Sequence, residues 1–304
     1  MRDYKENNDL INVSHLTKDF GNKRGVFDIS FNVKHGEIFG IIGESGAGKS
    51  TILRILMGFI KPSIGICEIE NLNCYYDAEQ IKEFVSYVSG EFSIFDFKSG
   101  SDFLKFISEL NNDDVNDPND LIKDFQLDIK AYPKRMSKGM KQKMALVTCF
   151  MKKSNIYLLD EPSIGLDPLM REELIKLIKY VNSQGATVVI TTNDYEEIKK
   201  LCNRVLVLSK GKAIDVINLN EILSPNLTYM TVELLKENDV CKIPKKWIID
   251  SNGRVVKLCI PSNHLGYFFK LMSEIDIELF ETNEFDLEHF VARRLEQTNE
   301  KAPI

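Results

Sequence analysis

The chain lacks any long hydrophobic run. Over its 304 residues, no apolar stretch approaches the ~18–20 residues that a membrane-spanning helix needs. The N-terminal stretch Met1–Asp9 has no apolar core either, so it does not have the pattern of a signal peptide. From these two absences we expect a protein that is made and kept in the cytoplasm.

The chain also lacks clustered cysteines and an excess of positive charge. Its six cysteines are scattered without C-x-x-C spacing, which predicts reduced, mostly buried thiols rather than disulfides or a zinc site. The net charge of −6 argues against nucleic acid as the main partner. Hydrophobic residues make up 43% of the chain, an ordinary balance for a globular protein.

Three glycines lie close together in a loop that has the pattern of a phosphate-binding site, Gly43, Gly46 and Gly48. Residues 43–51 fit G-x-x-x-x-G-K-[ST], between an apolar run at 38–42 and a helical pattern at 51–59. In such a loop, backbone N–H groups and the helix N-terminus bind phosphate oxygens. Lys49 would reach the β- and γ-phosphates of a nucleotide, and the Ser50 hydroxyl would bind Mg²⁺. The residues expected to contact the nucleotide are Gly43, Glu44, Ser45, Gly46, Ala47, Gly48, Lys49, Ser50 and Thr51.

The remaining pattern predicts an α/β fold. Short strands in residues 10–42 precede a helical stretch at 99–153, and strands then alternate with helices from 156 to 208. This alternation is typical of a mostly parallel sheet covered by helices. We therefore predict one domain over 10–219 with a helical subdomain inserted at about 92–153. Residues 220–304 read as a small α+β extension.

A pair of carboxylates closes a second motif. The apolar run before Asp160 reads as a buried strand, and Asp160 is followed directly by Glu161. In P-loop enzymes an aspartate in this position holds the Mg²⁺ shell. The neighbouring Glu161 would polarise the attacking water as general base. Taken alone, the motif is equally consistent with a strand whose exit happens to be acidic.

A third motif, Met136–Gln142, opens a helix. Ser137 is a natural N-cap, and Gly139 leaves room for a phosphate to approach the helix start. Without the other two motifs, this segment would indicate only a capped amphipathic helix.

Together and in this order, the motifs resemble those of the ATP-binding subunits of ABC transporters, over roughly residues 10–215. The signature Leu-Ser-Gly-Gly-Gln of that family appears here as Met136-Ser-Lys-Gly-Met140, a variant similar to that of ABC-2 type exporters. Ser163–Pro168 resembles the D-loop, with Asp167 in the matching position. Phe20 lies where the family stacks an aromatic ring on adenine, although a core position ahead of a turn explains it equally well.

The resemblance implies a fold, a reaction and partners. The fold is an ABC cassette with antiparallel N-terminal strands. ATP bound with Mg²⁺ would be held by one subunit and capped by the signature residues Ser137, Lys138 and Gly139 of a second ATP-binding subunit, identical or different. Hydrolysis would drive a separate integral-membrane permease, which places the chain on the inner face of the cell membrane. Family analogy favours export of peptides or drugs. The alternatives are a weakly hydrolysing member of an asymmetric pair and an ABC ATPase outside transport.

Two positions depart from the family pattern. Where the family has its switch histidine, this chain has Asn193, and its four histidines lie elsewhere. Asn193 can donate a hydrogen bond to the γ-phosphate but cannot carry a proton, so we expect slow turnover. It should also cap the helix predicted at 194–202. In the Q-loop, ungapped alignment places Gly90 at the glutamine. A shift of one residue offers Glu91 as a ligand to Mg²⁺ or water, which we favour.

The segment after Glu91 is rich in aromatic residues. Its rings, Phe95 and Phe97 among them, would form a groove for a permease helix, or they would simply pack in the core. For the 220–304 extension we expect a position beside the dimer interface or a regulatory role.

Overall fold

The computed structural model describes residues 9–94, 97–111 and 115–300. Phe95 therefore lies outside the described residues. The chain divides into two compact units: Met1–Ile217 with Val291–Ile304, and Asn218–Phe290. All six cysteines are free, and Cys67, Cys74, Cys149 and Cys202 are buried, which confirms the prediction of reduced, mostly buried thiols.

A six-stranded sheet forms the centre of the first unit, in the order β10-β9-β3-β8-β7-β6. Strands β9, β3, β8, β7 and β6 are parallel neighbours. Every residue of β3, β7 and β8 is buried, because helices cover both faces of a parallel sheet. The predicted mostly parallel α/β sheet is confirmed. The strands are β3 (Ile38–Ile42), β6 (Val85–Val88), β7 (Ile156–Asp160), β8 (Thr187–Thr192), β9 (Arg204–Ser209) and β10 (Lys212–Asn218).

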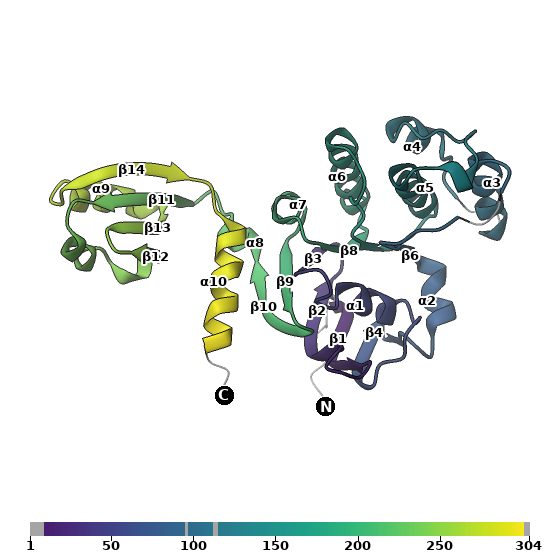
Figure 1. The fold of residues 1–304 in the computed structure, drawn as a ribbon, viewed down its shortest axis with the longest axis horizontal. Helices are drawn as coiled ribbons and strands as arrows, with labels where there is room; N and C mark the ends of the chain where they lie inside the picture. Colours follow the sequence, from purple (N-terminus) through teal and green to yellow (C-terminus); the bar gives the residue numbers. More distant parts are fainter. Residues whose placement is uncertain (1–8, 95–96, 112–114, 301–304) are drawn as a thin grey trace, which may run out of the picture. The chain divides into compact units, whose positions relative to one another are not determined.

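A second, antiparallel sheet lies below the first and has the order β2-β1-β4-β5. Helix α1 (Lys49–Leu56) lies between the two sheets. Its apolar face is buried in a single hydrophobic core that also contains residues from both sheets. Figure 1 shows α1 on the side of the central sheet that carries β1, β2 and β4, with α5 and α6 on the other side. The strands are β1 (Asp9–Asp19), β2 (Gly25–Lys34), β4 (Ile64–Ile69) and β5 (Leu72–Asn73).

Helices interrupt the chain between β6 and β7, as predicted. This segment holds α3 (Gly100–Leu110), α4 (Asn119–Asp124), a short 3-10 turn (Pro133–Arg135) and α5 (Lys138–Met151). Helices α6 (Pro168–Ser183) and α7 (Tyr195–Leu201) follow β7 and β8. The sequence analysis missed α2 (Ala78–Phe84) and β10. Each buries a single residue, Ile81 and Ile217, so neither shows a repeating pattern of apolar residues.

The aromatic segment after Glu91 packs on α3 in part. The Phe97 ring lies 5.4 Å from that of Phe103 and 5.2 Å from that of Phe106, and the Phe92 ring lies 6.2 Å from Phe103. Phe103 is buried, Phe92 and Phe97 are half-buried and Phe106 is exposed, so these rings pack at the edge of the core and the permease groove stays a prediction.

The second unit is built on an antiparallel sheet with the order β12-β13-β11-β14. One face packs against α9 (Leu265–Met272) and the single tryptophan, Trp247, in a core of its own. Helix α10 (Leu287–Glu300) begins in this unit and ends in the first. The other elements are α8 (Leu219–Ile222), β11 (Leu227–Leu234), β12 (Ile248–Asn252), β13 (Val255–Pro261), β14 (Ile277–Asn283) and 3-10 turns at Glu237–Lys242, Lys245–Trp247 and Ser262–His264.

Candidate nucleotide-binding site

The glycine-rich loop connects β3 to the N-terminus of α1. Gly48 is the N-cap residue of α1 and has φ +108°, and an added Cβ would lie 2.5 Å from Val26 Cγ1. Only glycine fits this combination of left-handed backbone and close contact. Because no side chain caps the helix start, its N–H groups remain available for an anion.

Lys49 is the buried cation of this loop, with 4% of its surface exposed. Its Nζ donates to the carbonyls of Gly43 at 2.7 Å and Glu44 at 3.2 Å. It also lies 3.2 Å from Glu161 Oε1. The side chain therefore arches over the loop, with its charge facing the Glu161 carboxylate.

Asp160 ends β7 and is held by two hydroxyl groups. Its Oδ1 accepts hydrogen bonds from Ser50 Oγ at 3.0 Å and from Thr191 Oγ1 at 2.7 Å. Thr191 reaches it because β7 and β8 pair in a register that places Asp160 beside Thr191. Our sequence interpretation missed Thr191. A signal was present in the sequence, since Thr191 lies at the end of the next predicted strand after that of Asp160, with one predicted helix between the two.

The Asp160 carboxylate and the Ser50 hydroxyl are hard oxygen donors of the kind that Mg²⁺ prefers. No cluster of three or more His, Cys, Asp or Glu side chains occurs anywhere in the described ranges. These two oxygens therefore suit an ion whose remaining ligands come from a phosphate and water.

Glu161 has a left-handed backbone, with φ +47°. Its N–H donates to the Thr191 carbonyl at 3.0 Å and lies 3.1 Å from Thr191 Oγ1, which fixes this conformation. A non-glycine residue in this region is uncommon and costs about 1–3 kcal/mol. The turn carries the Glu161 carboxylate from the end of β7 to the phosphate loop.

These groups line one cavity of about 340 Å³. The predicted residues that it brings together are Ser45, Gly46, Gly48, Lys49, Ser50, Thr51, Glu91, Lys138, Asp160 and Glu161. Arg54, Gly90 and Ile164 complete the lining. Predicted residues outside the lining are Phe20, Gly43, Glu44, Ala47, Ser137, Gly139, Asp167 and Asn193.

Gly90 lies directly beside the Asp160 carboxylate. A Cβ added to Gly90 would lie 3.3 Å from the Asp160 carbonyl oxygen and 3.7 Å from Asp160 Oδ2. The position that aligns with the family's glutamine thus faces the acid but presents no side chain. Glu91 lines the same cavity, and Ser89 Oγ stabilises the turn by donating to its carbonyl at 3.2 Å.

The signature helix α5 begins as predicted. Ser137 Oγ accepts from the Met140 N–H at 3.2 Å, which confirms the N-cap. Gly139 lies against the Gly165 carbonyl, and a Cβ there would come within 2.6 Å of that oxygen. Gln142 is buried and donates through Nε2 to the Pro162 carbonyl at 2.8 Å. This bond, which our interpretation of the sequence missed, ties α5 to the turn after Glu161.

At the edges of the site, one expectation was wrong and one alternative is excluded. Helix α7 is capped by Asp194, which accepts from Glu196 N at 2.9 Å and Glu197 N at 3.2 Å, and not by Asn193. Asp194 directly precedes the first helical residue, and its carboxylate also suits the positive helix end. Phe20 is 54% exposed, which excludes a core position, and Lys18 Nζ lies 5.5 Å from its ring centroid.

Two acids support the turns around the site. Asp167 caps α6 through a 3.0 Å bond from Met170 N to its Oδ1. Glu197 is buried and accepts from Ser163 Oγ at 3.1 Å. Burial raises the pKa of the Glu197 carboxyl above its ordinary value of 4.5, against the opposing hydrogen bonds from Thr192 and Ser163.

A phosphate loop whose lysine faces a glutamate, next to an aspartate held by the loop serine, defines a P-loop nucleoside triphosphatase. Residues 26–164 match the family model of ABC transporters. The chain is 34% identical over 278 residues to an uncharacterized ABC transporter ATP-binding protein of Methanocaldococcus jannaschii, covering 89% of this chain and 94% of that protein. The chain therefore belongs to the ABC transporter family, as an ATP-binding subunit with the ATPase site of that family.

Other relatives carry more specific names. The methionine import ATP-binding protein MetN of Chlamydia caviae is 34% identical over 256 residues, which covers 79% of this chain and 74% of MetN. Among solved structures, a dimeric ATP-binding cassette in a post-hydrolysis state with ADP and Pi has a TM-score of 0.61 at 22% identity. That match covers 69% of this chain and 98% of the cassette, and it shows the ABC cassette fold.

Within the described ranges, no helix is both long and apolar enough to cross a membrane.

Proposed function

We propose that this chain hydrolyses Mg·ATP as half of a two-subunit ATPase and thereby drives a membrane permease that is a separate polypeptide. The observation that carries the proposal is the convergence of Lys49, Ser50, Asp160 and Glu161 on one cavity. The second ATP-binding subunit and the permease are inferred from family membership. Such an assembly would hold the chain at the inner face of the cell membrane.

Each side chain has a separate task in this proposal. The loop N–H groups and Lys49 bind the phosphates, and Lys49 exchanges carbonyl acceptors for phosphate oxygens. Ser50 and Asp160 hold the metal. Bound Mg²⁺ would neutralise charge that develops on the phosphate oxygens. Glu161, released from Lys49 by the phosphates, orients and deprotonates the attacking water.

The residues capping the second subunit's nucleotide are proposed to be Ser137, Lys138 and Gly139, with Asp167 beside them. We further propose that Phe20 stacks on the adenine, since its ring is exposed. Asn193 donates a neutral hydrogen bond to the γ-phosphate, and Glu91 approaches the metal or the water from the loop that lines the cavity.

The test is Mg·ATP hydrolysis by the purified protein with Glu161→Gln. Removing a general base lowers rates by roughly 10²–10⁴-fold, so we expect a loss of at least about 100-fold while ATP binding persists. Glu172→Gln, which changes an exposed glutamate on α6, is the matched control and should hydrolyse normally. Unchanged hydrolysis in Glu161→Gln would instead indicate that a sister subunit supplies the turnover.

The direction of transport has two candidates. The Ser-Lys-Gly-Met variant of the signature supports export of peptides or drugs. Import is supported by the names of relatives such as MetN of Chlamydia caviae. Inside-out vesicles that contain this chain and its permease distinguish them: with external ATP, an exporter accumulates its cargo in the vesicles and an importer empties them.

A further inference from the structure

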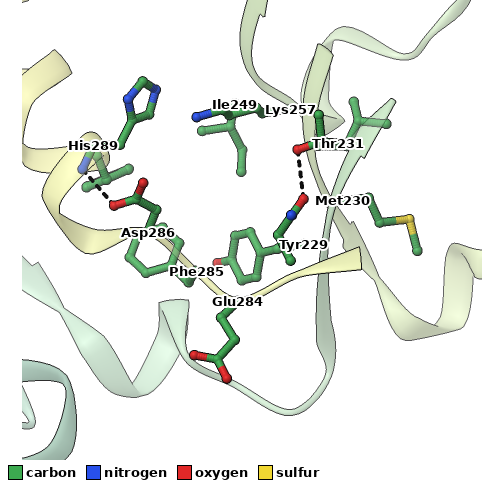
Figure 2. A pocket seen from close by; sticks show the side chains of 12 residues that line it. Tyr229, Met230, Thr231, Ile249, Lys257, Glu284, Phe285, Asp286 and His289 are labelled. Carbon is green, nitrogen blue, oxygen red and sulfur yellow. Dashed lines mark hydrogen bonds between the residues drawn. The ribbon is translucent and has the colours of Figure 1, made fainter. Parts of the chain in front are cut away.

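The second unit contains a cavity of its own, of about 300 Å³, whose twelve lining residues all lie within Asn218–Phe290 (Figure 2). Its floor is the sheet face opposite α9. Along β11 and β13, Met230, Val232 and Leu258 turn into the core with α9. The alternating residues Thr231 and Lys257 therefore point to the other face. The segment from Asn283 to Phe290 forms the opposite wall.

Aromatic rings form the apolar side of this cavity. The Tyr229 ring lies 5.0 Å from that of Phe285, and Phe285 lies 5.5 Å from Phe290. Tyr229 donates its hydroxyl to the Ile222 carbonyl at 2.7 Å. Burial raises the pKa of the Tyr229 phenol, so this wall carries no charge at neutral pH. Ile249 completes the apolar lining.

Lys257 is the cation of the cavity. It pairs across the sheet with Thr231, whose hydroxyl is already donated to Asn283 Oδ1 at 2.7 Å. No carboxylate of the described part of the chain lies within the 4.0 Å that defines an ion pair with its amine. Figure 2 shows the Lys257 side chain extending over the cavity between Thr231 and His289.

The acidic groups around the cavity have contacts other than Lys257 or point away from the aromatic wall. Asp286 Oδ1 accepts from the His289 N–H at 2.9 Å, at the start of α10, where the helix end balances a negative charge. The His289 ring is hydrogen-bonded to Asp250 at 2.9 Å, and Asp250 also lies opposite Lys257 in the register of β12 and β13. The Glu284 carboxylate points away from Tyr229 in Figure 2. Lys257 is thus the lysine of a lining that also holds two carboxylates, Glu284 and Asp286, and within the described ranges neither of these comes within ion-pair distance of its amine.

We propose that this cavity binds a small monocarboxylate with an aromatic or branched aliphatic body. The carboxylate meets the Lys257 amine, and the body lies against Tyr229, Phe285 and Ile249. A cavity of about 300 Å³ that combines aromatic and aliphatic walls with a few polar and charged groups has the usual composition of a small-molecule site. This site is independent of the nucleotide site and goes beyond the proposed function.

The test is calorimetric titration of the full chain with 3-phenylpropionate, its neutral amide 3-phenylpropionamide, and the cation 3-phenylpropylamine. We expect the carboxylate to bind at least about tenfold more tightly than the amide, a difference of about 1.4 kcal/mol. The amine should bind most weakly. Absence of binding by all three, or equal binding of acid and amide, overturns the proposal.

Variants of Lys257 test whether its amine is the group that binds the carboxylate. Lys257→Met should reduce the affinity for 3-phenylpropionate to that of the amide, and Lys257→Arg should retain most of it. Lys270→Met removes an exposed lysine from α9 on the other face of the sheet and is the matched control. Retained preference for the acid in Lys257→Met overturns the assignment. Because the assay needs no ATP, its failure leaves the proposed ATPase function unaffected.

Discussion

At the scale of single residues, the nucleotide site depends on how Asp160 is held. Its carboxylate is 1% exposed and accepts from both Ser50 and Thr191. Charge-assisted bonds of this kind are stronger than neutral ones. They hold the carboxylate in one orientation at the edge of the sheet. Thr191 also fixes the Glu161 backbone, so one hydroxyl residue positions both carboxylates.

Thr191→Val should therefore loosen the positions of both carboxylates, Asp160 and Glu161. Losing a hydrogen bond to a charged group costs about 1.5–3 kcal/mol, and we expect hydrolysis to fall by about tenfold or more. Steady-state hydrolysis at saturating Mg·ATP measures this effect. Thr148→Val, which removes a hydroxyl bonded within α5, is the control and should keep full activity. Equal losses in the two variants would contradict the positioning role of Thr191.

At the scale of elements, the start of helix α5 and the turn after β7 are fixed to each other by two contacts. Gly139 approaches the Gly165 carbonyl closely, and Gln142 bonds the Pro162 carbonyl. The helix start and the turn that follows Glu161 cannot move independently without breaking these contacts. A change in the signature helix would thus be transmitted to the base.

Gly139→Ala tests this close contact between α5 and the turn. An added Cβ would come within 2.6 Å of the Gly165 carbonyl oxygen, so overpacking should lower the free energy of unfolding by about 1–3 kcal/mol. Gly266→Ala in α9 is the matched control, since its Cβ would meet nothing within 4 Å. There, alanine should stabilise by roughly 0.5–1 kcal/mol. Urea denaturation of both variants gives the comparison, and equal effects would refute the close contact.

Helix α7 contributes a pH dependence through Glu197. Because burial raises the folded-state pKa of Glu197 above 4.5, the unfolded chain releases this proton first as pH rises. Above pH 4.5 the folded state therefore binds more protons at Glu197 than the unfolded state does. The contribution of this carboxyl to the free energy of unfolding is greatest below pH 4.5 and is lost as pH rises through the folded-state pKa. Glu197→Gln should remove this fall in urea denaturation between pH 4 and 7. Glu109→Gln, on the exposed side of α3, should leave it, and an unchanged slope in Glu197→Gln would contradict the argument.

At the scale of the whole molecule, the two units have separate cores. The second unit packs its own cluster around Trp247 and Phe268, and none of that cluster belongs to the core of the first. Each unit therefore has the apolar burial that an independent folding transition requires.

We expect two unfolding transitions as a result. ATP at about 100 times its Kd should stabilise the first unit by about 2.7 kcal/mol. Trp247 is the chain's single tryptophan and lies in the second unit, so its fluorescence transition should not move. Far-ultraviolet circular dichroism, recorded with and without ATP, reports both units, and most of its helical signal comes from the first. Lys49→Ala should lose the ATP shift, and an equal ATP shift in the Trp247 signal would show that the units unfold as one.

Prediction from sequence succeeded where the chemistry is local. The phosphate loop, the Ser137 cap and the acidic end of β7 each occupy a few consecutive residues, and spacing alone identifies them. It failed where the outcome depended on neighbours in space. Helix α7 is capped by Asp194 and not by Asn193, and the roles of Thr191 and Gln142 required knowing which strand and turn lie next to them.

The sequence by itself determined the class of site, because a phosphate-binding loop is made of adjacent residues whose backbone does the binding. Only the tertiary structure decided that Thr191 supports Asp160, that Gly90 faces the acid without a side chain, and that Lys257 lies in one cavity with Tyr229 and Phe285. Those relations arise from strand register and from turns far apart in the chain, and no local pattern encodes a distance between them.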